Sequence, residues 1–288
     1  MKVSHTKKFN KEISLKHGLY VVSTPIGNLE DITLRALNTL KNSDYVLCED
    51  TRNSIKLLNY YKIKNKLLRY YKFNEKNMTT KILGLLKEKK SISIISDAGT
   101  PTISDPGIIL INKCIEEKIN IYSIPGPSAL TSALSVCGFN EKFIFIGFLP
   151  KKTSEIEHII NKISNLDYSI VIFIPARKIN FLLELFKKYF NGRKIFIAKE
   201  MTKIYESYIR EDIENIDVNI KLKGELTVIL SQNKNLKKQS NELLDITKQE
   251  IKQMLKKYSH KDVVEFISKK ENLSKKIVYN YCLKIKKN

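Results

Sequence analysis

The chain has 288 residues, of which 42% are hydrophobic and 28% are charged, and it carries a formal net charge of +21 at pH 7. This length and composition fit a globular protein with two α/β domains. No apolar run reaches the roughly 18 residues that cross a bilayer, which excludes a membrane-spanning helix. The four cysteines and four histidines are scattered, so their spacing predicts neither a disulfide framework nor a metal site.

The first elements in chain order predict an α/β domain over residues 18–140. Residues 1–17 form a polar, basic stretch without the apolar core of a secretory signal, which predicts a flexible leader on a cytoplasmic protein. Short β-branched runs predict strands, and apolar periodicity predicts helices between them. The strands cover 18–23, 45–48, 91–96 and 119–124. One helix begins near Asp31 or Thr33, and further helices cover about 79–89 and 107–117. Alternation of this kind indicates a parallel sheet with helices on both faces.

A second α/β domain is predicted over residues 141–232. Its strands cover 143–146, 169–174, 194–198 and 225–231, with an amphipathic helix at 178–189. After Ser231 the pattern becomes purely helical, with segments at about 247–257, 261–270 and 274–286. Residues 233–288 are therefore predicted to form a basic helical tail.

The tail carries a large share of the positive charge. From Asn233 to Asn288 there are 15 lysines against 6 acidic residues. A basic cluster indicates a polyanionic partner, because each neutralised phosphate releases counterions. A general bias toward Lys, Asn and Ile codons is the alternative explanation. The clustering favours contact with nucleic acid.

Special turns follow the strands of the first domain. They are Thr24–Asn28, Glu49–Arg52, Ser96–Pro101 and Pro125–Ala129. Each alone is an ordinary turn former. In a parallel sheet, however, the carboxyl ends of the strands meet at one edge, where ligands bind. The sequence therefore predicts a small-molecule site, while phosphate-loop, dinucleotide, zinc-hydrolase and serine-hydrolase motifs are absent.

Ten segments in a fixed order carry a resemblance to a known family. They are Ser23–Leu29, Asp31–Thr33, Glu49–Arg52, Asn74–Glu75, Ser96–Pro101, Asp105–Gly107, Pro125–Ala129, Gly147–Pro150, Ala198–Lys203 and Gly224–Leu226. Together they resemble the family of ribosomal RNA small subunit methyltransferase I, over roughly residues 18–231. A Lys-rich helical tail is similar as well.

The resemblance implies two α/β domains of the tetrapyrrole methylase type, with an S-adenosylmethionine cleft between them and a small C-terminal helical segment. It also implies a homodimer that methylates the ribose 2′-hydroxyl of a decoding-centre cytidine in 16S rRNA of the 30S subunit. Neither a metal nor a membrane is implied. The cofactor residues that it implies are Pro25, Gly27, Asp97, Gly99, Thr100, Pro101, Pro125, Gly126, Ser128 and Ala129.

The catalytic candidates follow from the chemistry of the acceptor. A ribose hydroxyl is a weak nucleophile and benefits from a general base. Glu49 and Asp50 follow a strand directly, and Glu75 and Glu200 are further candidates. Arg52 fits either a phosphate, which guanidinium binds bidentately, or a salt bridge to a neighbouring carboxylate. Thr24 and Asn28 fit either the site or a capping role at the following helix.

One segment departs from the family pattern. After the strand that ends at Phe173, the family has Tyr-Glu-Ser/Ala-x-His-Arg, whereas this chain has Ile174-Pro175-Ala176-Arg177-Lys178. Arg177 and Lys178 therefore supply positive charge at positions shifted from those of the family's histidine and arginine. The departure leaves a non-catalytic RNA-binding assembly factor as an alternative. A methylase of a tetrapyrrole precursor is another, although such a substrate does not require a basic tail.

Overall fold

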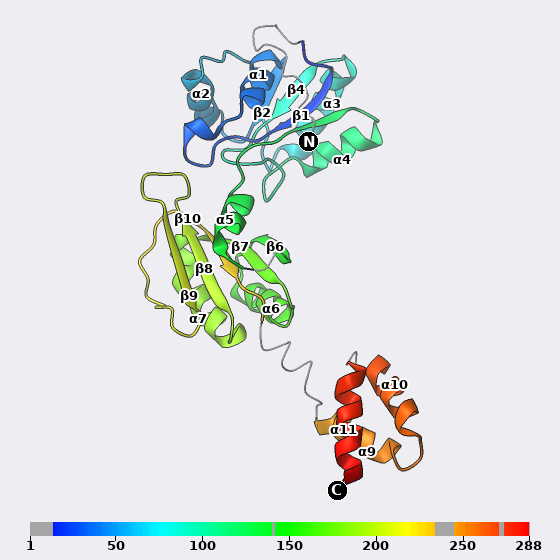
Figure 1. Ribbon diagram of the computed structural model, residues 1–288. Helices are drawn as coiled ribbons and strands as arrows, with labels where there is room; N and C mark the ends of the chain where they lie inside the picture. The colour runs from blue at the N-terminus through cyan, green and yellow to red at the C-terminus, as the bar shows by residue number, and fades with distance from the viewer. Residues whose placement is uncertain (1–13, 140–141, 234–244, 271–273, 288) are drawn as a thin grey trace, which may run out of the picture.

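The computed structural model describes residues 14–139, 142–233, 245–270 and 274–287. Most of the predicted leader, residues 1–13, lies outside the described residues, as do 140–141 at the predicted domain boundary. The described chain forms two five-stranded sheets, each with its own helices, followed by a group of C-terminal helices (Figure 1). The predicted fold class is confirmed.

The first sheet is entirely parallel. Its strands follow the order β3-β2-β4-β1-β5. They are β1 (Gly18–Val22), β2 (Tyr45–Cys48), β3 (Leu67–Arg69), β4 (Ser91–Ile94) and β5 (Ile121–Ile124). The predicted strands are all present, and β3 is an addition. It has only three residues between lysine-rich flanks, too short to show a hydrophobic period.

Helices cover both faces of this sheet, as the β/α alternation predicts. They are α1 (Leu34–Asn42), α2 (Thr51–Tyr60), α3 (Glu75–Lys87) and α4 (Ile108–Glu116). Leu40 of α1 and Leu58 of α2 pack against Tyr20 and Val22 on one face. The opposite face buries α3 and α4, with Ile82 and Leu110 among the buried side chains. Thr33 caps α1, where its hydroxyl accepts a hydrogen bond from the amide of Ala36.

The second sheet is mixed. Its order is β6-β7-β10-β8-β9, and β6 and β7 are parallel, whereas the other pairs are antiparallel. The strands are β6 (Phe143–Phe148), β7 (Ser169–Pro175), β8 (Lys194–Lys199), β9 (Ser207–Asp212) and β10 (Glu225–Leu230). The sequence did not predict β9, because this edge strand is polar and largely exposed.

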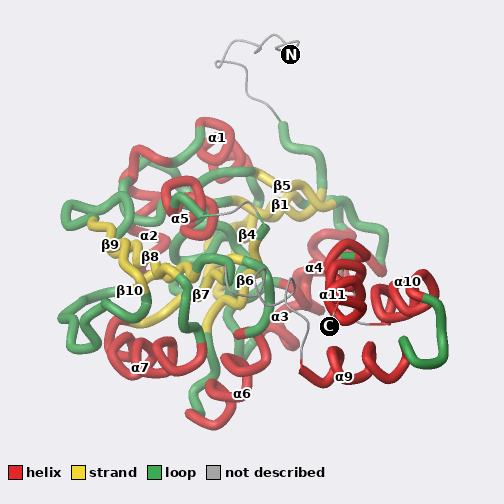
Figure 2. Tube along the Cα trace, turned by 60° about the horizontal axis from the view of Figure 1, so that its bottom comes forward, coloured by secondary structure: helices red, strands yellow, loops and turns green. Residues whose placement is uncertain are grey.

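Helices cover both faces of the second sheet (Figure 2). The helices α6 (Thr153–Ser164) and α7 (Ile179–Tyr189) bury Ile160 and Phe186 in the larger core. Ala133 of α5 (Ala129–Cys137) packs with Phe196 and Ile229 on the opposite face. Since α5 begins at the turn after β5, this helix joins the edge of the first sheet to a face of the second.

The C-terminal helices have a hydrophobic core of their own. They are α9 (Asp245–Met254), α10 (His260–Lys270) and α11 (Lys275–Lys287), close to the three helices that the sequence predicts. Ile251, Val263, Ile267, Val278 and Cys282 bury their side chains together. In the part of the chain that the structure describes, no helix has the length and apolarity to span a bilayer.

Candidate active site

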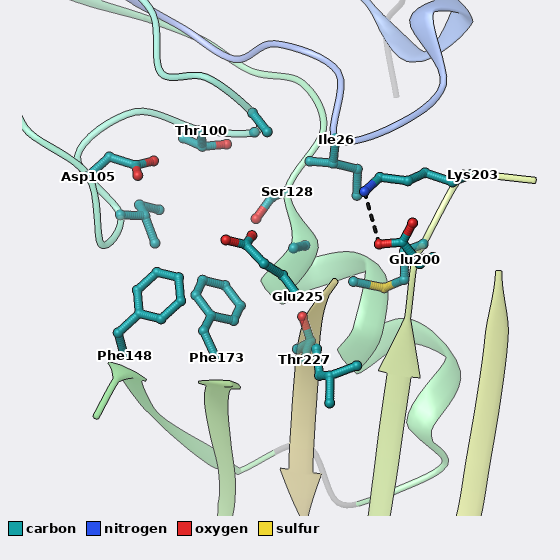
Figure 3. A pocket seen from close by; sticks show the side chains of 16 residues that line it. Ile26, Thr100, Asp105, Ser128, Phe148, Phe173, Glu200, Lys203, Glu225 and Thr227 are labelled. Atoms are coloured by element: carbon teal, nitrogen blue, oxygen red, sulfur yellow. Dashed lines mark hydrogen bonds and ion pairs between the residues drawn. The ribbon is translucent and has the colours of Figure 1, made fainter. Parts of the chain in front are cut away.

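A cleft lies between the carboxyl edge of the first sheet and one end of the second (Figure 3). It encloses about 800 Å³, part of it open to solvent. Turns of the first domain form one wall, and the ends of β6, β7, β8 and β10 form the other. The lining residues are Ile26, Ala98, Gly99, Thr100, Ile103, Asp105, Ser128, Ala129, Phe148, Phe173, Glu200, Met201, Lys203, Glu225, Leu226 and Thr227.

Hydrogen bonds tie three of the predicted turns into one wall. The backbone N–H of Thr24 donates to the carbonyl of Gly99 (2.8 Å), and the N–H of Gly99 donates to the carbonyl of Thr24 (3.0 Å). The Thr100 hydroxyl lies 2.9 Å from that of Ser23 and donates to the carbonyl of Pro127 (3.1 Å). Gly99 has φ +81°, which a residue with a side chain rarely adopts. The wall is therefore shaped before any ligand binds.

The two domains touch closely beside the cleft. The backbone N–H of Asn28 donates to the Thr202 hydroxyl across the domains (2.9 Å). Thr202 has φ +64° and Glu200 has φ +50°, so the loop that reaches across is held in a strained, left-handed conformation. Asn28 also caps the short helix Leu29–Asp31, as the capping interpretation predicts. Thr24 does not cap a helix; its hydroxyl contacts the carbonyl of Ser96 (3.3 Å).

Because Gly27 has no side chain, the loops of the two domains can lie this close together. A Cβ atom on Gly27 would lie 2.5 Å from Lys203 Cγ and 2.6 Å from Thr202 Oγ1. We expect Gly27→Ala to push the two loops apart and to weaken cofactor binding about tenfold, the effect of roughly 1.4 kcal/mol. Calorimetric titration with the cofactor measures this. Gly84→Ala is the matched control, since a Cβ there meets nothing within 4 Å; equal affinities for both variants would contradict the prediction.

The lining of the cleft is acidic although the chain is strongly basic. Asp105, Glu200 and Glu225 contribute carboxylates, against one ammonium group on Lys203, which pairs with Glu200 at 3.0 Å. Burial raises the pKa of Asp105 to about 6, and negative charge on Glu225 and Asp97 acts in the same direction. A carboxyl group with this pKa is able to accept a proton near neutral pH.

Glu49 and Glu75 lie behind the Asp105 loop. Burial raises the pKa of Glu49 to about 7, and the charges of Asp105, Asp97 and Glu75 act in the same direction. Glu75 is buried; it accepts hydrogen bonds from the backbone N–H of Gly107 (2.7 Å) and from the Tyr70 hydroxyl (3.3 Å). Neither residue lines the cleft. Glu75 thus holds the loop that presents Asp105.

Asp50 and Arg52 pair with each other at the surface. The Arg52 guanidinium donates to Asp50 Oδ2 at 2.6 Å and to Oδ1 at 3.1 Å, which corresponds to the salt-bridge interpretation. These hydrogen bonds lower the pKa of the Asp50 carboxyl to about 2. Asp50 also caps α2 through the Arg52 amide (2.9 Å). Both side chains are engaged with each other outside the cleft.

The structure separates the predicted cofactor residues into three groups. Gly99, Thr100, Ser128 and Ala129 line the cleft, together with the catalytic candidate Glu200. Pro25, Gly27 and Asp97 line a second hollow that adjoins it. Pro101, Pro125 and Gly126 belong to the same turns but line neither space, and Pro125 and Gly126 are exposed.

Sequence reasoning did not select Asp105, Glu225, Phe148 or Phe173. All four belong to, or directly precede, segments that the sequence analysis identified. The sequence therefore indicated these segments but not the roles of the individual residues. Glu225 comes to the cleft because β10 runs antiparallel to β7 and places Glu225 opposite Pro175. That pairing is a property of the sheet topology.

The departing segment borders the cleft without lining it. Pro175 ends β7, and residues Ala176–Lys178 form a short 3₁₀ turn. The Lys178 ammonium group donates to the carbonyl of Pro150 (3.3 Å), whereas Arg177 is exposed. Lys178 and Arg177 therefore lie close in the chain to the cleft-lining end of β7, and Lys178 contacts the segment that follows β6.

Comparison with known proteins agrees with this architecture. Residues 18–217 match the family model of Tetrapyrrole (Corrin/Porphyrin) Methylases. Among solved structures, uroporphyrin-III C-methyltransferase from Thermus thermophilus in complex with S-adenosyl homocysteine aligns with a TM-score of 0.54 at 13% identity, over 74% of this chain and 97% of that one. A diphthine synthase aligns with a TM-score of 0.57 at 13% identity, over 74% and 89%. The two domains and the cleft between them thus define a methylase of the tetrapyrrole methylase fold.

Curated relatives narrow this class. Ribosomal RNA small subunit methyltransferase I of Thermotoga maritima is 44% identical over 217 residues, which are 74% of this chain and 97% of the relative. The protein of the same name from Mesomycoplasma conjunctivae is 47% identical over 229 residues, 77% and 95% of the two chains. The chain belongs to the family of ribosomal RNA small subunit methyltransferase I. It is therefore an S-adenosylmethionine-dependent methyltransferase, as the resemblance implied.

The cleft residues fit that cofactor. Phe148, Phe173, Ile26 and Met201 supply apolar surface for an adenosine moiety, and the surrounding carboxylates favour a ligand with cationic ammonium and sulfonium groups.

Proposed function

We propose that the enzyme methylates the ribose 2′-hydroxyl of a decoding-centre cytidine in 16S rRNA of the small ribosomal subunit, cytidine 1402 in the usual numbering. The observation that carries this is an acidic donor cleft in a chain of net charge +21, 44–47% identical to proteins named for small-subunit rRNA methylation. We further propose that it acts as a homodimer in the cytoplasm.

Different residues of the cleft have different roles in methyl transfer. S-adenosylmethionine, when bound, supplies a methyl group on a sulfonium, and transfer is an in-line displacement in which positioning supplies much of the rate. Asp105 lies in the lining and burial raises its pKa to about 6, so it accepts the proton of the ribose hydroxyl. Glu75 holds the backbone of its loop through Gly107. The apolar side chains at the ends of β6 and β7 exclude water from one side.

The test is methyl transfer to purified 30S subunits from labelled S-adenosylmethionine, followed by nucleoside mapping. Ribose-methylated cytidine at one position supports the proposal. Label on a tetrapyrrole precursor but not on RNA would identify the methylase alternative, and cofactor binding without transfer would identify an assembly factor. Naked 16S rRNA, assayed in parallel, identifies which form of the RNA is the substrate.

The basic tail is expected to contribute affinity for RNA. Its helices have their own hydrophobic core, so they are removable as a unit. Truncation after Ser231 should weaken binding to 30S subunits. It should also flatten the plot of log affinity against log salt, by about 0.7–0.9 for each phosphate that the tail neutralises in the intact protein. Filter binding at several salt concentrations measures the slope. An unchanged slope would remove the tail from RNA binding.

A further inference from the structure

A second hollow adjoins the cofactor cleft on the side of the first domain. It is formed by the Pro25–Leu29 turn, by α2 from Asn53 to Tyr60 and by the start of the Ser96–Pro101 turn, and it encloses about 850 Å³, part of it open. Ile26 and Ala98 line both spaces, so the hollow and the cleft share a wall. Methyl transfer requires an acceptor beside the donor, and the hollow offers space for one.

A polar pair on the solvent-exposed wall of the hollow presents a pattern of hydrogen-bonding groups. Asn53 Nδ2 donates to Asp97 Oδ2 at 3.2 Å. Because a carboxylate only accepts, this bond fixes the orientation of the Asn53 amide. No other hydrogen bond of these two side chains is found among the described residues. The second N–H of Asn53 and the second oxygen of Asp97 are thus a donor and an acceptor that stand side by side.

The walls of the hollow fit a nucleobase. Leu29 and Leu57 are apolar, and Tyr60, 60% exposed, supplies an aromatic face on which a base can stack. Lys56 lies on the same helix and adds positive charge for a neighbouring phosphate. An extruded base is read through its Watson–Crick edge in enzymes that work on single nucleotides.

We propose that this hollow receives the base of the methyl-accepting nucleotide, and that Asn53 and Asp97 select cytosine over uracil; this rests on the proposed function. Cytosine presents an amino donor at N4 next to an acceptor at N3, which match Asp97 and Asn53 respectively. Uracil presents the reverse pattern, an acceptor at O4 and a donor at N3. Its acceptor would face the carboxylate oxygen of Asp97, and its donor would face the N–H of Asn53. In this proposal Asp97 contacts the methyl-accepting nucleotide and does not bind the cofactor.

The experiment compares single-turnover methylation of reconstituted 30S subunits with cytidine or uridine at the target position. We expect wild-type enzyme to prefer cytidine by about 5- to 150-fold, the discrimination of one bidentate contact. The double variant Asn53→Asp with Asp97→Asn exchanges donor and acceptor, so its preference should disappear or reverse. Asn59→Asp, the same change on α2 outside the hollow, is the matched control and should keep the wild-type ratio.

Calorimetric affinity for S-adenosylmethionine is measured on every variant and should stay within about threefold, less than 0.7 kcal/mol. If the double variant fails to fold or to turn over, Asn53→Leu, which removes the donor alone, must lower the preference for cytidine. An unaltered ratio in that variant, or a collapse of cofactor affinity on changing Asp97, would overturn the inference. Equal transfer to both nucleotides by wild-type enzyme overturns it too, whereas no transfer to RNA at all defeats the proposed function itself.

Discussion

Replacement of Asp105 by asparagine is expected to reduce the rate of methyl transfer about 100- to 10,000-fold, the usual contribution of a general base. Asparagine keeps the shape of the side chain but cannot take a proton. Cofactor affinity should fall far less than the rate, because Glu200 and Glu225 remain in the lining. Single-turnover transfer to 30S subunits measures the rate, and calorimetry measures the affinity. Retention of the wild-type rate would assign proton transfer to another group.

The pH dependence gives an independent check. The base form of Asp105 is required, and the pKa of this carboxyl is raised to about 6. The wild-type rate should therefore rise with pH up to about 6 and then level off. Glu225→Gln removes a like charge that raises this pKa, so it should move the rising limb to lower pH. A limb that stays in place would contradict the assignment.

Stability separates loss of function from loss of fold. A carboxyl group whose pKa is raised in the folded state binds protons more tightly there than in the unfolded chain. Its contribution to stability is present below the unfolded value near 4 and is lost as pH rises through about 6. Asp105→Asn removes this pH-dependent destabilisation. Its melting temperature at pH 8 should equal or exceed that of the wild type.

Replacement of Arg193 by methionine should destabilise the second domain by about 3–5 kcal/mol, the cost of breaking a buried charged network. The Arg193 side chain is fully buried. Its guanidinium donates to the carbonyls of Tyr168 (2.9 Å), Ser231 (2.7 Å), Ser164 (2.7 Å) and Leu166 (2.6 Å). Methionine fills similar space but leaves four carbonyl groups without this donor.

Urea denaturation followed by circular dichroism measures the change in stability. Arg177→Met is the matched control, because Arg177 is exposed and its replacement leaves no buried acceptor without a donor; it should change the free energy of unfolding by less than about 0.5 kcal/mol. A similar midpoint for the two variants would show that the carbonyl groups find other partners. Burial lowers the pKa of Arg193 to about 10, so the guanidinium stays charged at neutral pH.

One turn of the site shows where local sequence is informative. Ser96–Pro101 follows a buried strand and contains Gly99, whose positive φ strongly favours glycine. Strand, turn chemistry and glycine act within a few residues of each other, so the sequence alone predicted this turn as one wall of a site. The same local logic predicted the other strands of the parallel sheet apart from β3, a helix that begins near Asp31 or Thr33, and the tail helices.

Other features depend on contacts between segments far apart in the chain. Glu49 and Glu75 are equivalent carboxylates in the sequence, yet the pKa of Glu49 is raised to about 7, whereas Glu75 holds the backbone of Gly107. Burial and neighbours make these distinctions, and both arise from packing.

By itself, then, the sequence determined the α/β class, the turns that line one edge of the first sheet and the family to which the chain belongs. These are encoded in short segments, where hydrophobic period and backbone preference act locally. The tertiary structure decided that Asp105 and Glu225 face one cleft and that Asp97 lies with Asn53 in the hollow beside it. Such placements follow from strand order and domain contact, which bring together residues that are distant in the sequence.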